Sequence, residues 1–328
     1  MMQEPIPLVQ DVVLVGGGHA HALVLRMWAM DPLPGVRLTV INPNPAAPYT
    51  GMLPGLIAAH YRAEEIMIDL VRLARFAGAR VILDRAVGID RATKRVILAG
   101  RGALRYDLLS LDIGIGSDLP DVPGFAEHAV AAKPLGDYAR RWEAFVATAP
   151  AEPRLVLIGA GVGGVELALA SAHRLRAAGR APQVTLLEQG ETALPNIGAR
   201  ARATLLARLD AAGVVIRTET RPVAVEADHV RLSDGAKLAS DFTLSVAGAR
   251  PQGWLVETGL KVEAGFVTVD RHLQTSDPAI FAAGDCAYLS HAPRAKAGVY
   301  AVRAAPVLLH NLRAAAAGLP LQPFHPQR

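Results

Sequence analysis

The sequence is poor in cysteine, in lysine and in long apolar segments. Cys286 is its only cysteine, which excludes an internal disulfide, a C-x-x-C redox pair and a zinc site built from cysteines. Lysine occurs only at positions 94, 133, 237, 261 and 296, and the arginines are scattered, so the net charge of +4 does not predict a nucleic-acid-binding surface. No uncharged apolar run reaches the ~18–20 residues that span a bilayer, and residues 1–11 lack the pattern of a signal peptide. We therefore expect a cytoplasmic protein.

The composition is that of an ordinary globular protein. Of the 328 residues, 51% are hydrophobic and 20% are charged, which excludes a disordered or fibrous chain. This length allows about two domains with an ample core. Glycine and proline are plentiful without any repeat, as expected for many turns between short elements.

The stretch from Leu155 to Glu188 has the pattern of a dinucleotide-binding unit. An apolar strand is followed by a glycine turn, an Ala/Leu-rich helix and a second strand that ends on Glu188. The turn has the spacing G-x-G-x-x-G at Gly159, Gly161 and Gly164, which suits a tight turn, a close approach to a pyrophosphate and close packing of helix on strand. A carboxylate at 188 can take both ribose hydroxyls and repels a 2′-phosphate, so we expect NADH rather than NADPH. A helix-packing turn in some other α/β domain is the alternative.

Residues 11–42 repeat this pattern near the N-terminus. The strand DVVLV leads to Gly16–Gly18, a helix, and a strand VRLTVI that ends at Asn42. Two such units imply two nucleotides. His21 replaces the third glycine, which demands a wider approach of helix to strand, and Asn42 replaces the usual acid while keeping the capacity to hydrogen-bond a ribose hydroxyl. His19 and His21 lack a carboxylate or thiol partner nearby in the sequence, so we expect loop packing there rather than a metal site.

The segments between the two units predict the domain boundaries. The Pro/Gly-rich residues 42–61 are expected to line the cofactor, with a surface turn as the alternative. Residues 64–77 have helical spacing, and short apolar runs then lead to a core strand at 108–112. We place one boundary in the Gly/Pro-rich residues 113–124 and the other near 248–253.

Near the C-terminus, the short strand AIFAA ends at Gly284 and Asp285. Ligands gather at the carboxyl ends of strands in open α/β sheets, so Asp285 is a candidate acceptor for the hydroxyls of a polyol. The expected helix from about 296 to 316 can point the positive end of its dipole at an electron-rich ring. Taken alone, however, Gly-Asp is a common turn.

Four segments occur in the order used by flavoprotein reductases with two dinucleotide domains: VVLVGGGHAH, YDLLSLDIGIGS, IGAGVGGVELA and FAAGDCA. The sequence therefore resembles the pyridine nucleotide-disulfide oxidoreductase superfamily over nearly its whole length. Without a redox cysteine pair, it looks closest to type II NADH dehydrogenases rather than to disulfide reductases or sulfide:quinone reductases. The segments GGGHAHALVL, PYTGMLPGLIAAHY and KAGVYAVR also resemble the flavoprotein module that is fused to selenide, water dikinase in some bacteria.

The resemblance implies a FAD site in the first unit and an NADH site in the second. The residues expected at FAD are Gly16, Gly18, Asn42, Tyr49, Gly284, Asp285 and Lys296. The residues expected at NADH are Gly159, Gly161, Gly164 and Glu188. Glu166 matches a family glutamate near flavin and nicotinamide and is our candidate catalytic residue, although it could simply be an acid near a helix N-terminus. Cys286 is expected to be a buried small residue rather than a nucleophile, and no metal is expected.

The architecture implied is α/β, with two Rossmann-like three-layer domains: a FAD domain of residues 1–120 and 250–328, interrupted by an NAD(P)H domain of residues 121–249. The implied activity is hydride transfer from NADH to FAD, then electron transfer to a small non-disulfide acceptor such as a quinone. A flavoprotein module in selenium metabolism and a nucleotide-binding sensor or assembly module without turnover are the alternatives. Relatives continue past the last helix into a region that forms dimer, quinone or membrane surfaces. This sequence ends at FHPQR, so we expect either that it is truncated or that its acceptor site is reduced, which argues against the quinone and membrane assignments. A homodimer, a selenophosphate-synthesis partner and a peripheral place on the inner face of the membrane are further expectations.

Overall fold

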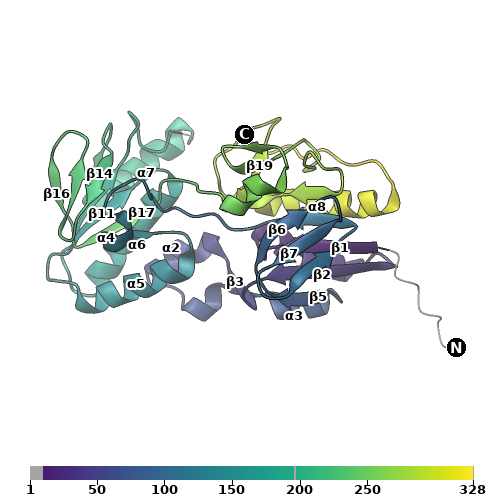
Figure 1. The fold of residues 1–328 in the computed structure, drawn as a ribbon. Helices are drawn as coiled ribbons and strands as arrows, with labels where there is room; N and C mark the ends of the chain where they lie inside the picture. The colour runs from purple at the N-terminus through teal and green to yellow at the C-terminus, as the bar shows by residue number, and fades with distance from the viewer. Residues whose placement is uncertain (1–9, 196, 328) are drawn as a thin grey trace. The chain divides into compact units, whose positions relative to one another are not determined.

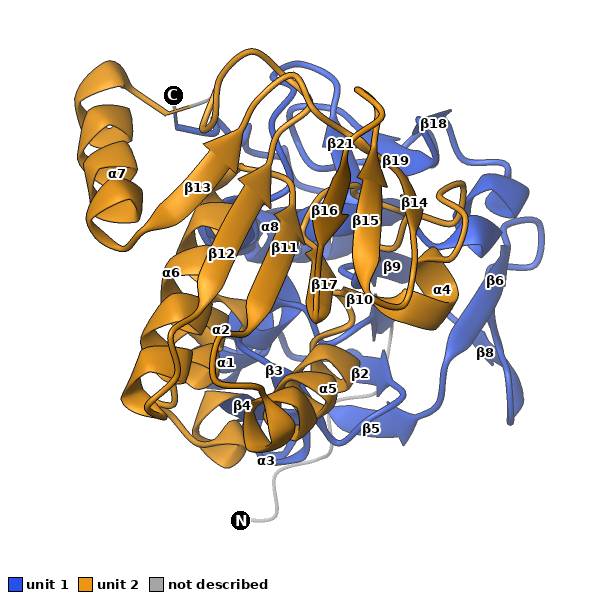
Figure 2. Cartoon of the chain, turned by 90° about the vertical axis from the view of Figure 1, so that its left-hand side faces the viewer, with its two compact units in different colours: residues 1–49, 67–115, 251–328 blue, residues 50–66, 116–250 orange. Residues whose placement is uncertain are grey.

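The computed structural model describes residues 10–195 and 197–327, and the chain forms two compact units (Figure 2). Unit 1 contains residues 1–49, 67–115 and 251–328, and unit 2 contains residues 50–66 and 116–250. Each unit is built around its own five-stranded sheet, and Figure 1 labels many of the strands and helices.

Unit 1 is organised around a parallel sheet in the order β5-β2-β1-β9-β20. Smaller sheets flank it, in the orders β6-β7-β8, β18-β19-β21 and β3-β4. Its elements are β1 Gln10–Val15, α1 His19–Met30, β2 Val36–Asn42, β3 Ala46–Pro48, β4 Met67–Asp69, α3 Leu70–Phe76, β5 Arg80–Leu83, β6 Ala86–Asp90, β7 Arg95–Leu98, β8 Gly102–Arg105, β9 Leu108–Leu111, η3 Gly253–Thr258, β18 Val262–Glu263, β19 Phe266–Val269, β20 Ile280–Ala282, η4 Gly284–Cys286, β21 Ala287–Leu289 and α8 Gly298–Ala317.

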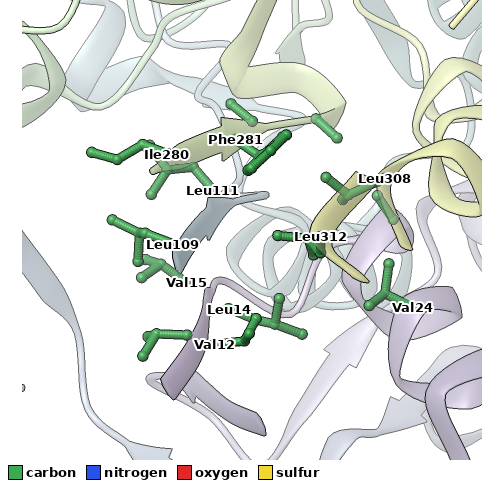
Figure 3. Close-up of a cluster of buried hydrophobic side chains, with 14 of the residues drawn as sticks. Val12, Leu14, Val15, Val24, Leu109, Leu111, Ile280, Phe281, Leu308 and Leu312 are labelled. Carbon is green, nitrogen blue, oxygen red and sulfur yellow. The ribbon is translucent and has the colours of Figure 1, made fainter. Parts of the chain in front are cut away.

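The central strands of unit 1 are apolar on both faces. Residues Val12–Val15 of β1 are buried, as expected for a parallel strand that is covered on both sides. Figure 3 shows three of them, Val12, Leu14 and Val15, in one cluster with side chains of β9, β20, α1 and α8: Leu109, Leu111, Ile280, Phe281, Val24, Leu308 and Leu312. In this register, Val15 pairs with Leu111 and Leu111 with Ala282. The residues that follow β1, β9 and β20 therefore meet at one edge of the sheet.

Unit 2 repeats this sheet in the order β13-β12-β11-β17-β10, again with parallel neighbours. In both units, a three-stranded antiparallel sheet precedes a strand that returns to pair with the first strand of the unit's Rossmann-like motif. In unit 1, β6-β7-β8 precedes β9, which pairs with β1; in unit 2, β14-β15-β16 precedes β17, which pairs with β11. The elements of unit 2 are η1 Thr50–Met52, α2 Leu53–Ile57, η2 Ala63–Ile66, α4 Phe125–His128, β10 Ala129–Ala131, α5 Leu135–Thr148, β11 Arg154–Ile158, α6 Val162–Ala177, β12 Gln183–Leu187, α7 Ala199–Ala211, β13 Val214–Arg217, β14 Pro222–Val225, β15 His229–Leu232, β16 Lys237–Ala239 and β17 Phe242–Ser245. The expected α/β fold with two Rossmann-like units is confirmed.

Residues 50–66 belong to unit 2, although they follow a strand of unit 1. Their apolar side chains, including those of Leu53, Leu56 and Ile57, pack in the core of unit 2 with Trp142 and Val165. The indole Nε1 of Trp142 also donates a hydrogen bond to the carbonyl of Ile57 at 3.1 Å. The units divide after residues 115 and 250, against our expected boundaries after 120 and 249.

The prediction of one helix was wrong. Residues 64–77 were expected to form a single helix, but the segment contains η2, β4 and then α3 from Leu70. The strand β4 forms because it pairs with β3, and Asp69 starts the helix by accepting a hydrogen bond from the backbone N–H of Arg72 at 2.8 Å. Among the residues that the structure describes, no helix is both long enough and apolar enough to cross a membrane.

Candidate dinucleotide sites

The glycine loop of unit 1 joins the carboxyl end of β1 to the start of α1. Gly16 has φ of +96°, a conformation that favours glycine, and its N–H donates to the carbonyl of Ile41 at 2.8 Å. The N–H of Gly17 donates to Oδ1 of Asn42 at 2.9 Å. Three of the residues expected at FAD, Gly16, Gly18 and Asn42, therefore lie together at the edge of the sheet.

His21 occupies the position of the missing third glycine and is completely buried. Its Nδ1 lies 2.7 Å from the carbonyl oxygen of Gly16, and its Nε2 lies 2.8 Å from Oγ of Ser110. Burial lowers the pKa of His21 to about 4, so the ring is neutral near pH 7. With both nitrogens engaged, His21 is a packing residue. Within 10–195 and 197–327, no group of three or more His, Cys, Asp or Glu side chains is arranged to hold a metal.

Asp112 lies at the candidate site, and the sequence did not predict it. It follows β9 and is only 4% exposed, and its Oδ2 accepts a hydrogen bond from the N–H of His21 at 2.9 Å. A Cβ at Gly18 would lie 2.3 Å from the carboxyl carbon of Asp112, and one at Gly284 would lie 2.2 Å from its Oδ1. Burial raises the pKa of Asp112 to about 6. The available signal was an acid at the carboxyl end of an apolar strand, which we included in the strand itself.

The residues expected from the C-terminal part of the site lie around η4. Asp285 lines a small cavity of about 30 Å³, together with Lys296, Tyr300 and Phe324. This volume accommodates a water molecule or two rather than a ring system. The ammonium of Lys296 donates to the carbonyl of Ala287 at 2.5 Å and lies 3.9 Å from the centroid of the Phe266 ring. The contacts with the Ala287 carbonyl and the Phe266 ring direct the ammonium of Lys296 toward the interior of unit 1.

Tyr49 of the expected FAD set and Cys286, which was expected to be a buried small residue, can also be placed. Tyr49 is 38% exposed, and its ring centroid lies 4.9 Å from that of His19 at the start of α1. Cys286 is fully buried, as expected, and burial raises the pKa of its thiol to about 12. At that pKa the thiol is protonated at neutral pH, which does not suit a nucleophile.

The glycine loop of unit 2 has the same hydrogen-bonding plan. The N–H of Gly159 donates to the carbonyl of Leu187 at 2.8 Å, as that of Gly16 does to Ile41 in unit 1. The N–H of Ala160 donates to Oε2 of Glu188 at 3.1 Å, and Oε1 of Glu188 accepts from Gly190 at 2.9 Å. Glu188 therefore accepts a hydrogen bond from a loop N–H in unit 2, as Asn42 does in unit 1.

The remaining glycines test whether a dinucleotide fits unit 2. A Cβ at Gly164 would lie 1.8 Å from the carbonyl oxygen of Gly159, so close packing alone requires this glycine. Gly161 has φ of −71°, which any residue adopts, and a Cβ there would meet no protein atom within 4 Å. A pyrophosphate at the start of α6 would account for a glycine at 161, where the protein itself does not require one.

Glu166 lies on the exposed side of α6, one turn into the helix. Partial loss of its water shell raises the pKa of the carboxyl. Its place near a nicotinamide stays a prediction.

Comparisons with known proteins agree with this architecture. The chain is 34% identical over 210 residues to the nitric oxide reductase FlRd-NAD(+) reductase of Aeromonas hydrophila; the match covers 61% of this chain and spans about half the length (50%) of that relative. It is 25% identical over 295 residues to the NADH dehydrogenase-like protein YutJ of Bacillus subtilis, covering 88% of this chain and 79% of the relative. Among solved structures, a covalent putidaredoxin reductase-putidaredoxin complex matches with a TM-score of 0.77 and 26% identity, covering 96% of this chain and 77% of that one.

The model of one protein family matches nearly the whole chain. The match is to pyridine nucleotide-disulphide oxidoreductase and covers residues 10–305, so it includes both glycine loops and the Gly284–Cys286 segment. Cys286 alone cannot form a redox disulfide. The expectation of an oxidoreductase that uses FAD and NAD(H) is confirmed, and the chain belongs to the pyridine nucleotide-disulphide oxidoreductase family.

Proposed function

We propose that the protein is an FAD-dependent NADH oxidoreductase, in which unit 1 binds FAD, unit 2 binds NADH, and a non-disulfide acceptor takes the electrons. The observation that carries this proposal is the duplicated loop, with a neutral Asn42 in one copy and Glu188 in the other. When both cofactors are bound, the nicotinamide supplies a hydride and the flavin accepts it. The protein residues bind and orient these groups.

In the proposed FAD site, Gly16 and Gly18 face the pyrophosphate and Asn42 faces the ribose. Gly284 and Asp285 are proposed to bind the ribityl and phosphate region, because they follow β20 at the same edge of the sheet as Gly16. Tyr49 and Lys296 are proposed to lie near the flavin ring. The FAD domain so defined corresponds to the expected residues 1–120 and 250–328.

In the proposed NADH site, Gly159, Gly161 and Gly164 form the pyrophosphate turn and Glu188 binds the adenosine ribose. The carboxylate of Glu188 can accept from both ribose hydroxyls and repels a 2′-phosphate, which supports NADH over NADPH. The next residues, Gln189, Gly190 and Glu191, add no positive charge that would hold such a phosphate. Glu166 is proposed to position the nicotinamide against the flavin, within an NAD(P)H domain of residues 121–249.

Two classes of acceptor have support. A quinone is the acceptor that the resemblance to type II NADH dehydrogenases implies, and a small electron-transfer protein is suggested by the names of the FlRd-NAD(+) reductase and of the putidaredoxin reductase-putidaredoxin complex. A selenium compound remains the third proposal, from the resemblance to the module fused to selenide, water dikinase. A nucleotide-binding sensor would bind the same cofactors and would not sustain turnover.

Anaerobic addition of NADH to the FAD-loaded protein tests the function. We expect the visible absorbance of the flavin to bleach, because the hydride passes from nicotinamide to flavin. Subsequent mixing with a quinone, an acidic redox protein or selenite identifies the acceptor as the oxidant that restores the absorbance. Flavin absorbance unchanged by NADH would refute the proposed activity, and bleaching without sustained NADH consumption with any oxidant would favour the sensor.

A further inference from the structure

The N–H groups around the unit 1 loop are already hydrogen-bonded by the protein. The N–H of Gly17 donates to Oδ1 of Asn42, and the N–H of Gly18 donates to the backbone carbonyl of Asp112 at 3.2 Å. The N–H of His21, in the first turn of α1, donates to Oδ2 of Asp112 at 2.9 Å. A helix N-terminus normally offers such donors to the phosphates of a nucleotide. The carboxylate of Asp112 therefore occupies an N–H donor that a pyrophosphate would use.

Unit 2 shows that the fold does not need an acid at this position. Ser245 pairs with Ile158 as Leu111 pairs with Val15, so Val246 is the counterpart of Asp112. The Val246 side chain lies 3.4 Å from where a Cβ at Gly163 would stand. An apolar residue therefore suffices in the NADH-type loop, and the buried carboxylate is particular to the FAD-type loop.

The charges around Asp112 come from α1 and η4. His19 lies on α1, and the acidic Asp285 and the thiol of Cys286 belong to η4. His21 adds no positive charge, because burial keeps its ring neutral. Burial has the largest effect on the pKa of Asp112, while the charge of His19 lowers it and that of Asp285 raises it. At 4% exposure the Asp112 carboxylate is screened little by water, so the two negative charges of a pyrophosphate would be repelled by its charged form.

We propose that Asp112 determines the affinity for FAD by taking up one proton from solvent when the pyrophosphate binds at Gly16–Gly18. The carboxylate becomes a neutral carboxylic acid, which removes the repulsion and gives the group an O–H donor. The raised pKa of about 6 that burial already causes brings this protonation within reach near neutral pH. The inference rests on the proposed function, because it assumes that FAD binds in unit 1.

The test is the dissociation constant of FAD, measured by quenching of flavin fluorescence on the apoprotein from about pH 5.5 to about pH 8.5. For the natural chain we expect the Kd to be flat below about pH 6 and then to rise, approaching tenfold per pH unit, because one proton is linked to binding. The D112N variant, which keeps an acceptor for the His21 N–H and loses the charge, should give a Kd that does not vary with pH. The exposed D210N variant should behave as the natural chain does.

Calorimetry in two buffers of different ionisation enthalpy gives a second readout. At about pH 7.5, FAD binding should take up close to one proton in the natural chain and none in D112N. If D112N fails to fold, D112V, which copies Val246 of unit 2, replaces it, and the proton count of the natural chain decides by itself. A pH-independent Kd with no proton uptake in the natural chain would overturn the inference. Absence of FAD binding at every pH would instead refute the FAD assignment of unit 1.

Discussion

Glu188 and Asn42 perform the same structural task with different charge. Each accepts the N–H of the middle residue of its glycine loop, from Ala160 in unit 2 and from Gly17 in unit 1. A carboxylate and an amide differ little in shape, so the loop geometry survives either one. The difference in charge is what separates the two proposed nucleotide sites.

Replacing Glu188 with alanine should weaken NADH binding and leave FAD bound. The variant loses the acceptor for the N–H groups of Ala160 and Gly190 as well as the proposed ribose ligand. Hydrogen bonds to a charged group contribute about 1.5–3 kcal/mol, so we expect the Kd for NADH to rise on the order of 10- to 100-fold. The Kd follows from a titration of flavin bleaching, with retained flavin measured from absorbance.

The matched variant E188Q separates charge from hydrogen bonding. It keeps the size of the side chain and an acceptor for Ala160 and removes the charge that repels a 2′-phosphate. We expect the ratio of the NADPH and NADH dissociation constants to move toward one. Loss of flavin with intact NADH binding in E188A would show that the two units bind the opposite cofactors.

Residues that are part of a local sequence motif could be predicted from the sequence, whereas residues brought to the site from elsewhere in the chain could not. Gly159, Gly164 and Glu188 follow from one local pattern, and their contacts are explained within that pattern. Asp112 lies far along the chain from Gly18 and His21, and only the pairing of β9 with β1 brings it beneath the loop. An acid in an apolar run gives no indication of its partner.

Among the elements, β1, its loop and α1 differ from the family spacing at His21. The substitution H21G restores the third glycine, yet it removes hydrogen bonds to Gly16 and Ser110 and leaves a cavity. We expect it to destabilise the protein by about 2–4 kcal/mol near pH 7, which corresponds to a fall in Tm on the order of 5–10 °C. Thermal unfolding followed by circular dichroism measures this change.

The loss of folding stability caused by H21G should depend on pH. The folded pKa of about 4 lies below the ordinary value of 6.5, so the unfolded chain binds the proton first as pH falls. The stability that neutral His21 contributes is present above pH 6.5 and decreases by about 3 kcal/mol toward pH 4. The Tm gap between the natural chain and H21G should narrow over that range, while H128G, at an exposed histidine, shows no such narrowing. A gap that widens on acidification would contradict a buried neutral ring.

Residues 42–61 show where periodicity fails at the scale of elements. Their proline and glycine content indicated a rigid loop, but the segment forms β3, η1 and α2. Whether it lines the cofactor stays a prediction. The packing of Leu56 and Ile57 with Trp142 assigns most of it to unit 2. Short helices carry too few residues for a recognisable period, and tertiary contacts decide their place.

For the whole molecule, the repeated strand, loop, helix and strand made the two-unit architecture predictable from the sequence. The acceptor was not predictable, because an acceptor docks on side chains brought together from separate segments. Two whole-chain properties bear on it: the absence of a cysteine pair, which excludes relay through a disulfide, and the net charge of +4. A positive chain attracts anionic partners over distances of about a Debye length.

If the proposed acceptor is an acidic electron-transfer protein, its rate should depend strongly on salt. Raising NaCl from about 0.05 M to about 0.5 M shortens the Debye length severalfold, so we expect the rate of acceptor reduction to fall on the order of tenfold. Reduction of the flavin by NADH, measured alone by stopped flow, should change far less and serves as the control. A neutral quinone as acceptor should give a rate that is insensitive to salt. A salt-independent rate with the acidic protein, together with faster turnover with the quinone, would assign electron transfer to the small molecule instead.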